Sequence, residues 1–297
     1  MKIAVAGASG FVGQTLVAYL KRNHHEVIRL VRHKPESAGE VAWQPARHQI
    51  SESDLEGVDA IVNLAGENIG AGRWTAARRA RIGTSRFDAT QTLVDAIGRM
   101  PRPPTVLISA SGAGYYGSRG DETLTEESAR GSGFLAEVCR EWERRAREPE
   151  RRGVRTVQLR FGLILSGKGG ALDRLRPIFR SGLGGRLGPG TQWMSWVSLT
   201  DAIRVIDFAL ENAACRGALN LTAPNPVTNA EFTAKFAAAL HRPAPFAVPA
   251  WVLRLGLGRM ADETLLASTR AVPAKLEALG FRFTDQDLAS YLARGEL

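Results

Sequence analysis

The chain has 297 residues, which is enough to bury a substantial core in one large domain or two smaller ones. Its composition, 44% hydrophobic and 23% charged, is ordinary for a globular protein, and no run of about 18 apolar residues predicts a membrane span. The two cysteines, Cys139 and Cys215, cannot build a disulfide framework or a Cys/His metal cluster. With no signal peptide ahead of the first strand, we expect a cytoplasmic protein with no membrane partner and no metal.

The net charge of +9 makes nucleic-acid binding an alternative to consider. Lysine occurs at only six positions, so the excess is an arginine bias rather than a binding pattern. The densest basic run, Arg140 to Arg152, is interleaved with glutamates at a spacing typical of a solvated helix face. We therefore expect no nucleic-acid partner.

Strand-like and helix-like segments alternate through the first half of the chain. Strands are predicted over 2–6, 26–31, 60–64, 105–109 and 155–159, and helices directly after the first strand and over 86–97 and 134–146. This alternation predicts an α/β fold with a doubly wound parallel sheet and helices on both faces. Ligands of such sheets bind outside the carboxyl ends of the strands.

After about residue 165 the composition changes. Segments 166–170 and 182–190 are glycine-rich, a helix is predicted over 201–210, and a strand over 218–221. A proline-rich patch between 224 and 249 then marks a change to another module. We predict a Rossmann-type domain over 1–220, with segments of a smaller C-terminal α/β substrate part from about 165, and a further small C-terminal domain over 246–293.

The segment that follows the first strand has the spacing of a dinucleotide fingerprint. Gly7 would allow a tight turn, Gly10 would let the backbone approach a pyrophosphate, and Gly13 would let the helix pack close to the sheet. The N–H groups at the helix start would face the phosphates. The alternative is a glycine turn of purely structural value.

The end of the second strand bears on the choice of cofactor. An Asp or Glu usually binds the adenosine ribose 2′-OH of NAD here, but no acid follows Arg32 before Glu36. Arg32 can grip a 2′-phosphate in a bidentate manner, so the sequence favours NADP(H) over NAD(H). The alternative is that Arg32 is an ordinary surface arginine.

Several longer segments resemble the short-chain dehydrogenase/reductase superfamily, in its extended, epimerase-like branch. More narrowly, the chain resembles the "epimerase family protein" subgroup, the 39U class, with its C-terminal domain of unknown function. The shared segments are Asn63 to Asn68, Arg73-Trp74, Ser109 to Gly117, Phe179 to Gly188, Gln192 to Trp196 and Asn220 to Pro224.

The resemblance implies an NADP(H)-binding Rossmann domain and assigns its contacts position by position. The implied pyrophosphate contacts are Gly7, Ser9, Gly10, Phe11, Val12 and Gly13. The adenosine end would meet Val31 and Arg32, and further contacts would come from Asn63, Leu64, Ala65, Gly66, Arg86 and Leu163, the last near the nicotinamide. Glu67 and Asn68 lie just past a strand end and are candidates for substrate binding, with loop capping as the alternative.

The usual catalytic pair of the superfamily, Tyr-x-x-x-Lys, is missing. Residues 134–140 hold neither residue type. Tyr116, or Tyr115 with Arg119, could supply the proton instead, and Ser111 could bind the substrate oxygen; a packed loop is the alternative. We therefore expect an oxidoreductase or epimerase acting on an unidentified small polar substrate, or a catalytically silent NADP(H)-binding sensor or scaffold.

Overall fold

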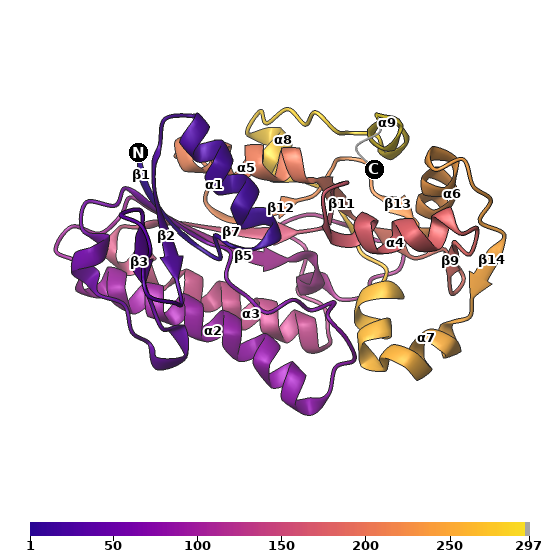
Figure 1. Ribbon diagram of the computed structural model, residues 1–297, viewed down its shortest axis with the longest axis horizontal. Coiled ribbons are helices and arrows are strands. Elements are labelled where there is room, and N and C mark those ends of the chain that lie inside the picture. Colours follow the sequence, from indigo (N-terminus) through magenta and orange to yellow (C-terminus); the bar gives the residue numbers. More distant parts are fainter. Residues whose placement is uncertain (295–297) are drawn as a thin grey trace.

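The computed structural model describes residues 1–294 and is built on a seven-stranded parallel sheet (Figure 1). The strand order is β12-β7-β5-β4-β1-β2-β3, so the chain winds outward in both directions from β1. The strands are β1 (Lys2–Ala6), β2 (Glu26–Val31), β3 (Glu40–Ala42), β4 (Ala60–Asn63), β5 (Val106–Gly112), β7 (Arg155–Phe161) and β12 (Gly217–Leu221). This order confirms the prediction of a Rossmann-type doubly wound fold.

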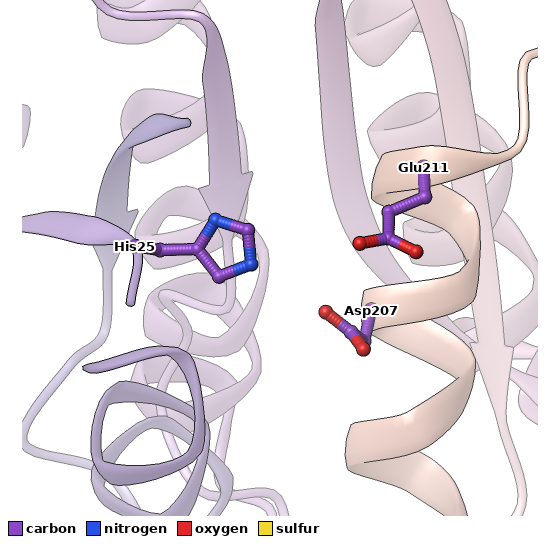
Figure 2. A group of neighbouring side chains, drawn as sticks. All are labelled: His25, Asp207 and Glu211. Carbon is purple, nitrogen blue, oxygen red and sulfur yellow. The ribbon is translucent and has the colours of Figure 1, made fainter. Parts of the chain in front are cut away.

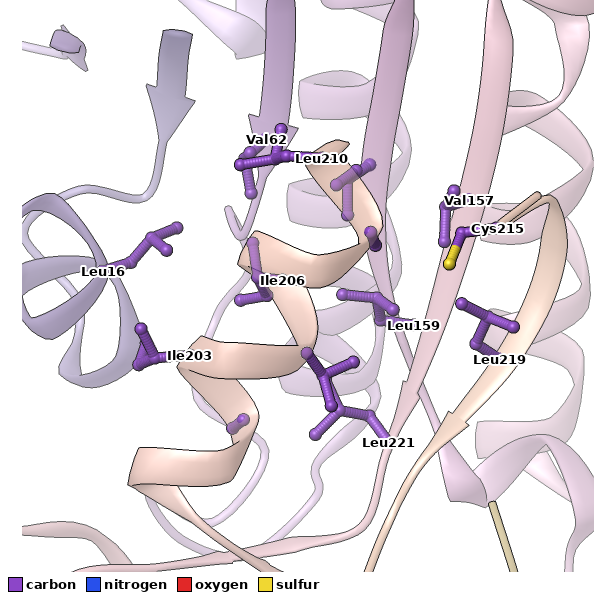
Figure 3. Close-up of a cluster of buried hydrophobic side chains, with 14 of the residues drawn as sticks. Leu16, Val62, Val157, Leu159, Ile203, Ile206, Leu210, Cys215, Leu219 and Leu221 are labelled. Carbon is purple, nitrogen blue, oxygen red and sulfur yellow. The ribbon is translucent and has the colours of Figure 1, made fainter. Parts of the chain in front are cut away.

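Helices cover both faces of this sheet, as Figure 1 shows. On one face lie α1 (Phe11–Arg22), α5 (Leu199–Glu211) and α8 (Ala274–Ala278); on the other lie α2 (Ala76–Arg99) and α3 (Phe134–Ala146). Because successive strand residues point to opposite faces of the sheet, the strands contribute side chains to two separate apolar cores, one on each face. Figure 3 shows the first, in which Leu16 of α1 and Ile203, Ile206 and Leu210 of α5 pack onto the sheet.

The predictions agree best with the structure for elements whose buried residues give the sequence a clear apolar pattern. The strands at 2–6 and 26–31 and the helix at 134–146 have the predicted limits. Helix α2 begins ten residues earlier than predicted, because Thr75 caps it by accepting the Arg78 N–H. Its first turns are rich in alanine and arginine, which favour helix without an apolar stripe. The short edge strand β3 was not predicted.

After residue 163, α5, β12 and α8 belong to the central sheet and its covering layer, whereas a second set of elements gathers at one end of the molecule (Figure 1). They are β8 (Leu163–Leu165), α4 (Gly170–Arg180), β9 (Gly185–Leu187), β10 (Trp193–Met194), β11 (Trp196–Ser198), β13 (Val227–Thr228), α6 (Asn229–Ala239), β14 (Phe246–Val248), α7 (Ala250–Leu257) and α9 (Leu288–Ala293). Within residues 1–294, no helix is long and apolar enough to cross a membrane.

The C-terminal segment returns to the first half of the chain. Strand β15 (Arg270–Ala271) pairs with β6 (Thr123–Leu124), and Glu126 accepts the Lys275 backbone N–H. A single turn of π-helix, 261–265, precedes this pairing. The C-terminal segment is therefore part of the same packed unit as the sheet.

Candidate cofactor site

The glycine turn, residues 7–13, joins β1 to α1 with little space for side chains. Gly7 has φ +77°, and a Cβ there would lie 2.8 Å from the backbone of Leu64. A Cβ on Gly13 would lie 2.1 Å from the Gly7 carbonyl oxygen. A Cβ on Gly10 would meet only that same oxygen, at 3.2 Å. Gly7 and Gly13 thus hold the turn, the helix and the end of β4 together.

The first turn of α1 presents free donors at the carboxyl edge of the sheet. Within residues 1–294, the backbone N–H groups of Phe11, Val12 and Gly13 donate to no other group. The N-cap residue, Gly10, has no side chain that could cap the helix, and the first turn of α1 holds no acidic residue. Free N–H groups and the positive end of a helix dipole suit a phosphate anion. Ser9 lies in the same turn and accepts a hydrogen bond from Gln14 at its carbonyl.

A segment from the second half of the chain also reaches this turn. The Phe11 ring lies against the backbone at the start of α4, where a Cβ on Gly169 or Gly170 would come within 3.0–3.2 Å of the ring. The exposed Lys168 stands beside these glycines. Sequence reasoning identified segment 166–170 as glycine-rich but did not place it at the fingerprint, because the contact joins residues about 160 positions apart.

Arg32 follows β2 at the same edge. Strand β2 pairs with β1 so that Leu30 lies opposite Ala6, which places Val31 and Arg32 beside the glycine turn. Val31 is half-buried, and its carbonyl accepts the Trp43 N–H. The Arg32 side chain is exposed and has no ion-pair or hydrogen-bond partner in the described part of the chain. Its guanidinium is therefore available to an anion.

The end of β4 closes the other side of the turn. The Leu64 N–H donates to the Ala6 carbonyl, and the side chain of Asn63, fully buried, bonds to Thr90 and to the Ala65 N–H. Asn63 therefore shapes the strand end with its side chain, and Leu64 and Ala65 remain half-buried at the edge.

Arg86 fastens the segment after β4 to α2. Its guanidinium donates to the carbonyls of Ile82 and Glu67 and lies 5.1 Å from the centre of the Trp142 ring. Burial lowers the pKa of Arg86. A Cβ on Gly66 would lie 3.2 Å from the Arg86 Cζ, so the two residues are in direct contact.

The two residues predicted to bind substrate, Glu67 and Asn68, make different contacts within the protein. Glu67 forms ion pairs with Arg78 and Arg81, at 3.6 and 3.3 Å. Asn68 is exposed, and its side-chain oxygen accepts the Gly70 N–H at 2.8 Å. This contact is the loop capping that the sequence analysis gave as the alternative to substrate binding. Neither residue is buried.

Ser111 and Tyr116 lie in a buried polar network, here called the Arg160 network, formed by Ser111, Tyr116, Glu143, Arg160 and Asn220. Arg160 donates to both carboxylate oxygens of Glu143, at 2.8 and 2.9 Å, and to the Tyr116 hydroxyl at 2.8 Å. Ser111 donates to Glu143 at 2.8 Å, and Tyr116 lies 2.7 Å from the acceptor Oδ1 of Asn220. Every member therefore has partners inside the protein.

Tyr116 has no exposed surface in this conformation. Its burial raises the pKa of the phenol to about 12. The neighbouring Tyr115 is half-buried and stacks on Arg160, whose Cζ lies 3.5 Å from the ring centre. Arg119, its suggested helper, is held by two hydrogen bonds to Glu122, both at 2.8 Å.

Helix α3 is the segment in which the resemblance leads us to look for the catalytic pair. Leu135 and Cys139, four residues apart, face the end of β5: Cβ atoms built on Gly114 and Gly112 would lie 3.1 Å from Leu135 and 3.8 Å from the Cys139 sulfur. Cys139 is buried, and burial raises the pKa of its thiol to about 11, so it packs as a small hydrophobe.

The C-terminal segment contributes a carboxylate that sequence reasoning missed. Glu263, in the π-helical turn, accepts the Leu135 N–H at 2.8 Å and so caps the otherwise uncapped α3. No local sequence signal links residues that are 128 positions apart. Leu163 lies in β8, and its N–H donates to the Ser195 carbonyl. In the segment that follows Ser195, Trp196 is fully buried in the core.

Comparison with known proteins agrees with this architecture. Residues 3–221 match the NAD dependent epimerase/dehydratase family, and residues 248–294 match a domain of unknown function, DUF1731. An epimerase family protein of Mycobacterium leprae is 40% identical over 98% of this chain and 94% of its own length. A Mycobacterium tuberculosis relative is 43% identical over 95% of this chain and 93% of its own length.

A crystal structure of the human epimerase family protein SDR39U1 with NADPH superposes with a TM-score of 0.91. It is 34% identical and covers 99% of this chain and 98% of the human chain. These relatives therefore match nearly the whole length of this chain, including the regions of both family models. The chain belongs to the NAD dependent epimerase/dehydratase family, within the SDR39U1-like epimerase family proteins that carry a C-terminal DUF1731 domain.

Proposed function

We propose that the protein binds NADP(H) and uses it as an oxidoreductase or epimerase on a small polar substrate, without a Tyr-x-x-x-Lys pair. The observation that carries the proposal is the glycine turn, where three backbone N–H groups without a partner among residues 1–294 share one sheet edge with the exposed Arg32. The human relative that was crystallised with NADPH supports the same choice of cofactor.

The residues divide the cofactor between them. The N–H groups of Phe11, Val12 and Gly13 would bind the pyrophosphate, and Arg32 would bind the 2′-phosphate. The end of β4, with Leu64, Ala65 and Gly66, would lie along the dinucleotide, and Leu163 would lie near the nicotinamide. When bound, the nicotinamide supplies a hydride donor or acceptor.

Glu67 and Asn68 would contact the substrate. Tyr116 would supply the proton, and Ser111 would bind the substrate oxygen. The best general acids have a pKa near the working pH, whereas burial raises the pKa of Tyr116 to about 12. Full burial of this hydroxyl favours a second candidate function, a catalytically silent NADP(H)-binding sensor or scaffold.

Calorimetric titration with NADPH and NADH, for the wild type and Arg32→Ala, tests the cofactor proposal. A charge-assisted contact to a phosphate contributes about 1.5–3 kcal/mol, so Arg32→Ala should weaken NADPH binding about 10- to 100-fold and leave NADH unchanged. Arg151→Ala removes an equally exposed arginine away from the turn and should change neither affinity. Absence of binding by either nucleotide would overturn the proposal.

A screen of small carbonyl and hydroxyl compounds, followed by NADPH absorbance, separates the two candidate functions. Turnover that Tyr116→Phe abolishes without changing NADPH affinity would establish the enzyme. Turnover that survives Tyr116→Phe would remove Tyr116 from the mechanism. Tight NADPH binding with no turnover across the screen would favour the silent protein.

A further inference from the structure

Segment 166–170 brings the second half of the chain onto the glycine turn. It leads from β8 into α4 and lies against Phe11, the first residue of α1. A Cβ on Gly169 would lie 3.0 Å from the Phe11 ring, and one on Gly170 would lie 3.2 Å from it. Gly170 also has φ +76°, a backbone conformation that favours glycine. The segment is therefore fitted closely to a residue whose backbone N–H is a proposed phosphate donor.

Hydrogen bonds hold the backbone of this segment without using the Lys168 side chain. The buried Ser166 accepts the Lys168 N–H at its hydroxyl oxygen, at 3.1 Å. Arg176, one of the residues of α4, donates to the Gly167 carbonyl at 2.6 Å. The backbone on which Lys168 stands is thus fixed beside the start of α1, whereas its side chain is left for another role.

The Lys168 side chain is exposed, and its ammonium forms no ion pair or hydrogen bond with any residue that the structure describes. The nearest acidic residue along the chain, Asp173, pairs with Arg176 at 3.5 Å. A lysine carries a compact positive charge on a flexible four-carbon stem. Such a side chain can extend past the Phe11 ring toward an anion bound at the first turn of α1.

The protein places no carboxylate at this position to compensate the charge of Lys168. Residues 7–13 and 163–172 contain no Asp or Glu. Glu67 is engaged by two arginines of α2. The carboxylates of Asp207 and Glu211 lie beside His25, which follows the far end of α1 (Figure 2). A fixed backbone, a free cation and no nearby carboxylate together favour an anionic ligand.

We propose that Lys168 binds the pyrophosphate of the dinucleotide, together with the N–H groups at the start of α1. This inference rests on the proposed function, because it adds a residue to the same cofactor site. The N–H groups carry only partial charges, so a full positive charge strengthens binding of a pyrophosphate. NADP(H) and NAD(H) share the pyrophosphate, whereas only NADP(H) has the 2′-phosphate assigned to Arg32. Lys168 would therefore contribute to affinity for both nucleotides, and Arg32 to the choice between them.

Calorimetric titration of wild type and Lys168→Met with NADPH and with NADH tests this division. Methionine keeps an unbranched side chain and removes the charge. We expect both affinities to fall about tenfold, the lower end for a charge-assisted contact because Lys168 is exposed, with their ratio unchanged. Lys168→Arg keeps the charge and should retain most of both affinities. Lys21→Met, which removes an exposed lysine at the other end of α1, should change neither.

Salt dependence gives a second readout. The wild-type affinity for either nucleotide should fall more steeply with added salt than that of Lys168→Met, because the variant has lost one screened charge contact. The Tm of the nucleotide-free proteins should be the same, since the Lys168 side chain makes no contact that the variant removes.

The outcomes separate this inference from the proposed function. If the wild type binds neither nucleotide, both are overturned. If the wild type binds and Lys168→Met binds equally well, only the role of Lys168 is lost. A loss confined to NADPH would also overturn the inference, because it would place Lys168 at the 2′-phosphate. Equal losses in Lys168→Met and Lys21→Met would overturn it too, since they would reflect net charge rather than a contact.

Discussion

The glycine turn follows β1, and the Arg160 network lies at the ends of β5, β7 and β12 on the other side of β4 in the same sheet; the two regions differ in which polar groups they leave without protein partners. The turn is built from backbone, and its first-turn donors and Arg32 remain free of partners in the described residues. The network is built from side chains that satisfy one another, with Tyr116 fully enclosed. A backbone site can stay available while it stabilises the fold, whereas this side-chain site has its polar groups committed to the core.

The largest expected effect comes from breaking the network itself. Arg160→Met removes the bidentate partner of the buried Glu143 carboxylate and leaves it only the longer ion pair with Arg147, at 3.7 Å. This change should lower the free energy of unfolding by about 3 kcal/mol, the lower end for a broken buried pair. Urea denaturation of the two proteins measures this loss. The double variant Arg160→Met/Glu143→Leu should be more stable than Arg160→Met alone. A single variant as stable as the wild type would mean that the pair is not isolated from water.

Gly13→Ala tests the other region. The added methyl would lie 2.1 Å from the Gly7 carbonyl oxygen, so the turn must move. We expect a loss of about 3 kcal/mol in stability, at the upper end for overpacking, together with loss of NADPH binding in calorimetry. Gly98→Ala, at an open position in α2, should instead gain about 0.5–1 kcal/mol. Unchanged NADPH binding in Gly13→Ala would separate the turn from the cofactor.

Tyr116→Phe removes one hydroxyl from the network and should cost about 1–2 kcal/mol. Because burial raises the pKa of this phenol from 10.0 to about 12, its protonated form stabilises the fold fully below pH 10. That contribution is lost as the pH rises from 10 toward 12. The stability difference between wild type and Tyr116→Phe should therefore narrow over this range, as thermal unfolding would show. A constant difference would contradict the assigned pKa.

The smallest effect is expected at Glu141, which lies on α3 two residues before Glu143 and also binds two arginines, Arg144 and Arg145. These arginines lower the pKa of Glu141 to about 2. Solvent screens the ion pairs of Glu141, so Glu141→Gln should lower the free energy of unfolding by less than about 1 kcal/mol. This loss should become smaller with added salt. Chemical denaturation at two salt concentrations measures both. A cost equal to that of Arg160→Met would remove the contrast between the fully buried Glu143 pair and the partly exposed Glu141 pairs.

Sequence reasoning succeeded where one local pattern determines both structure and chemistry. The spacing of Gly7, Gly10 and Gly13 after a buried strand predicts the turn, and the structure has the close approaches that require glycine at Gly7 and Gly13. The doubly wound sheet followed from strand and helix alternation in the same way. The choice of NADP(H) as the cofactor and the role of each individual site residue stay predictions.

Sequence reasoning could not resolve what depends on distant partners. Tyr116 was one of two adjacent tyrosines, and only its contacts with Arg160 and Asn220 show which one is enclosed. Glu263 carries no motif, yet it caps α3 from the far end of the chain. Such contacts depend on how the chain folds back on itself, which neither periodicity nor spacing records.

The return of the C-terminal segment to the first half has a consequence for synthesis. Strand β6 pairs with β15, Glu126 accepts the Lys275 N–H, and α3 receives its cap from Glu263, so these contacts of the first half form only after residues 263–275 exist. A nascent chain halted after residue 221 would leave the ribosome with β6 unpaired and α3 uncapped. We therefore expect the two regions matched by separate family models to fold as one cooperative unit, and neither to fold fully as a detached fragment.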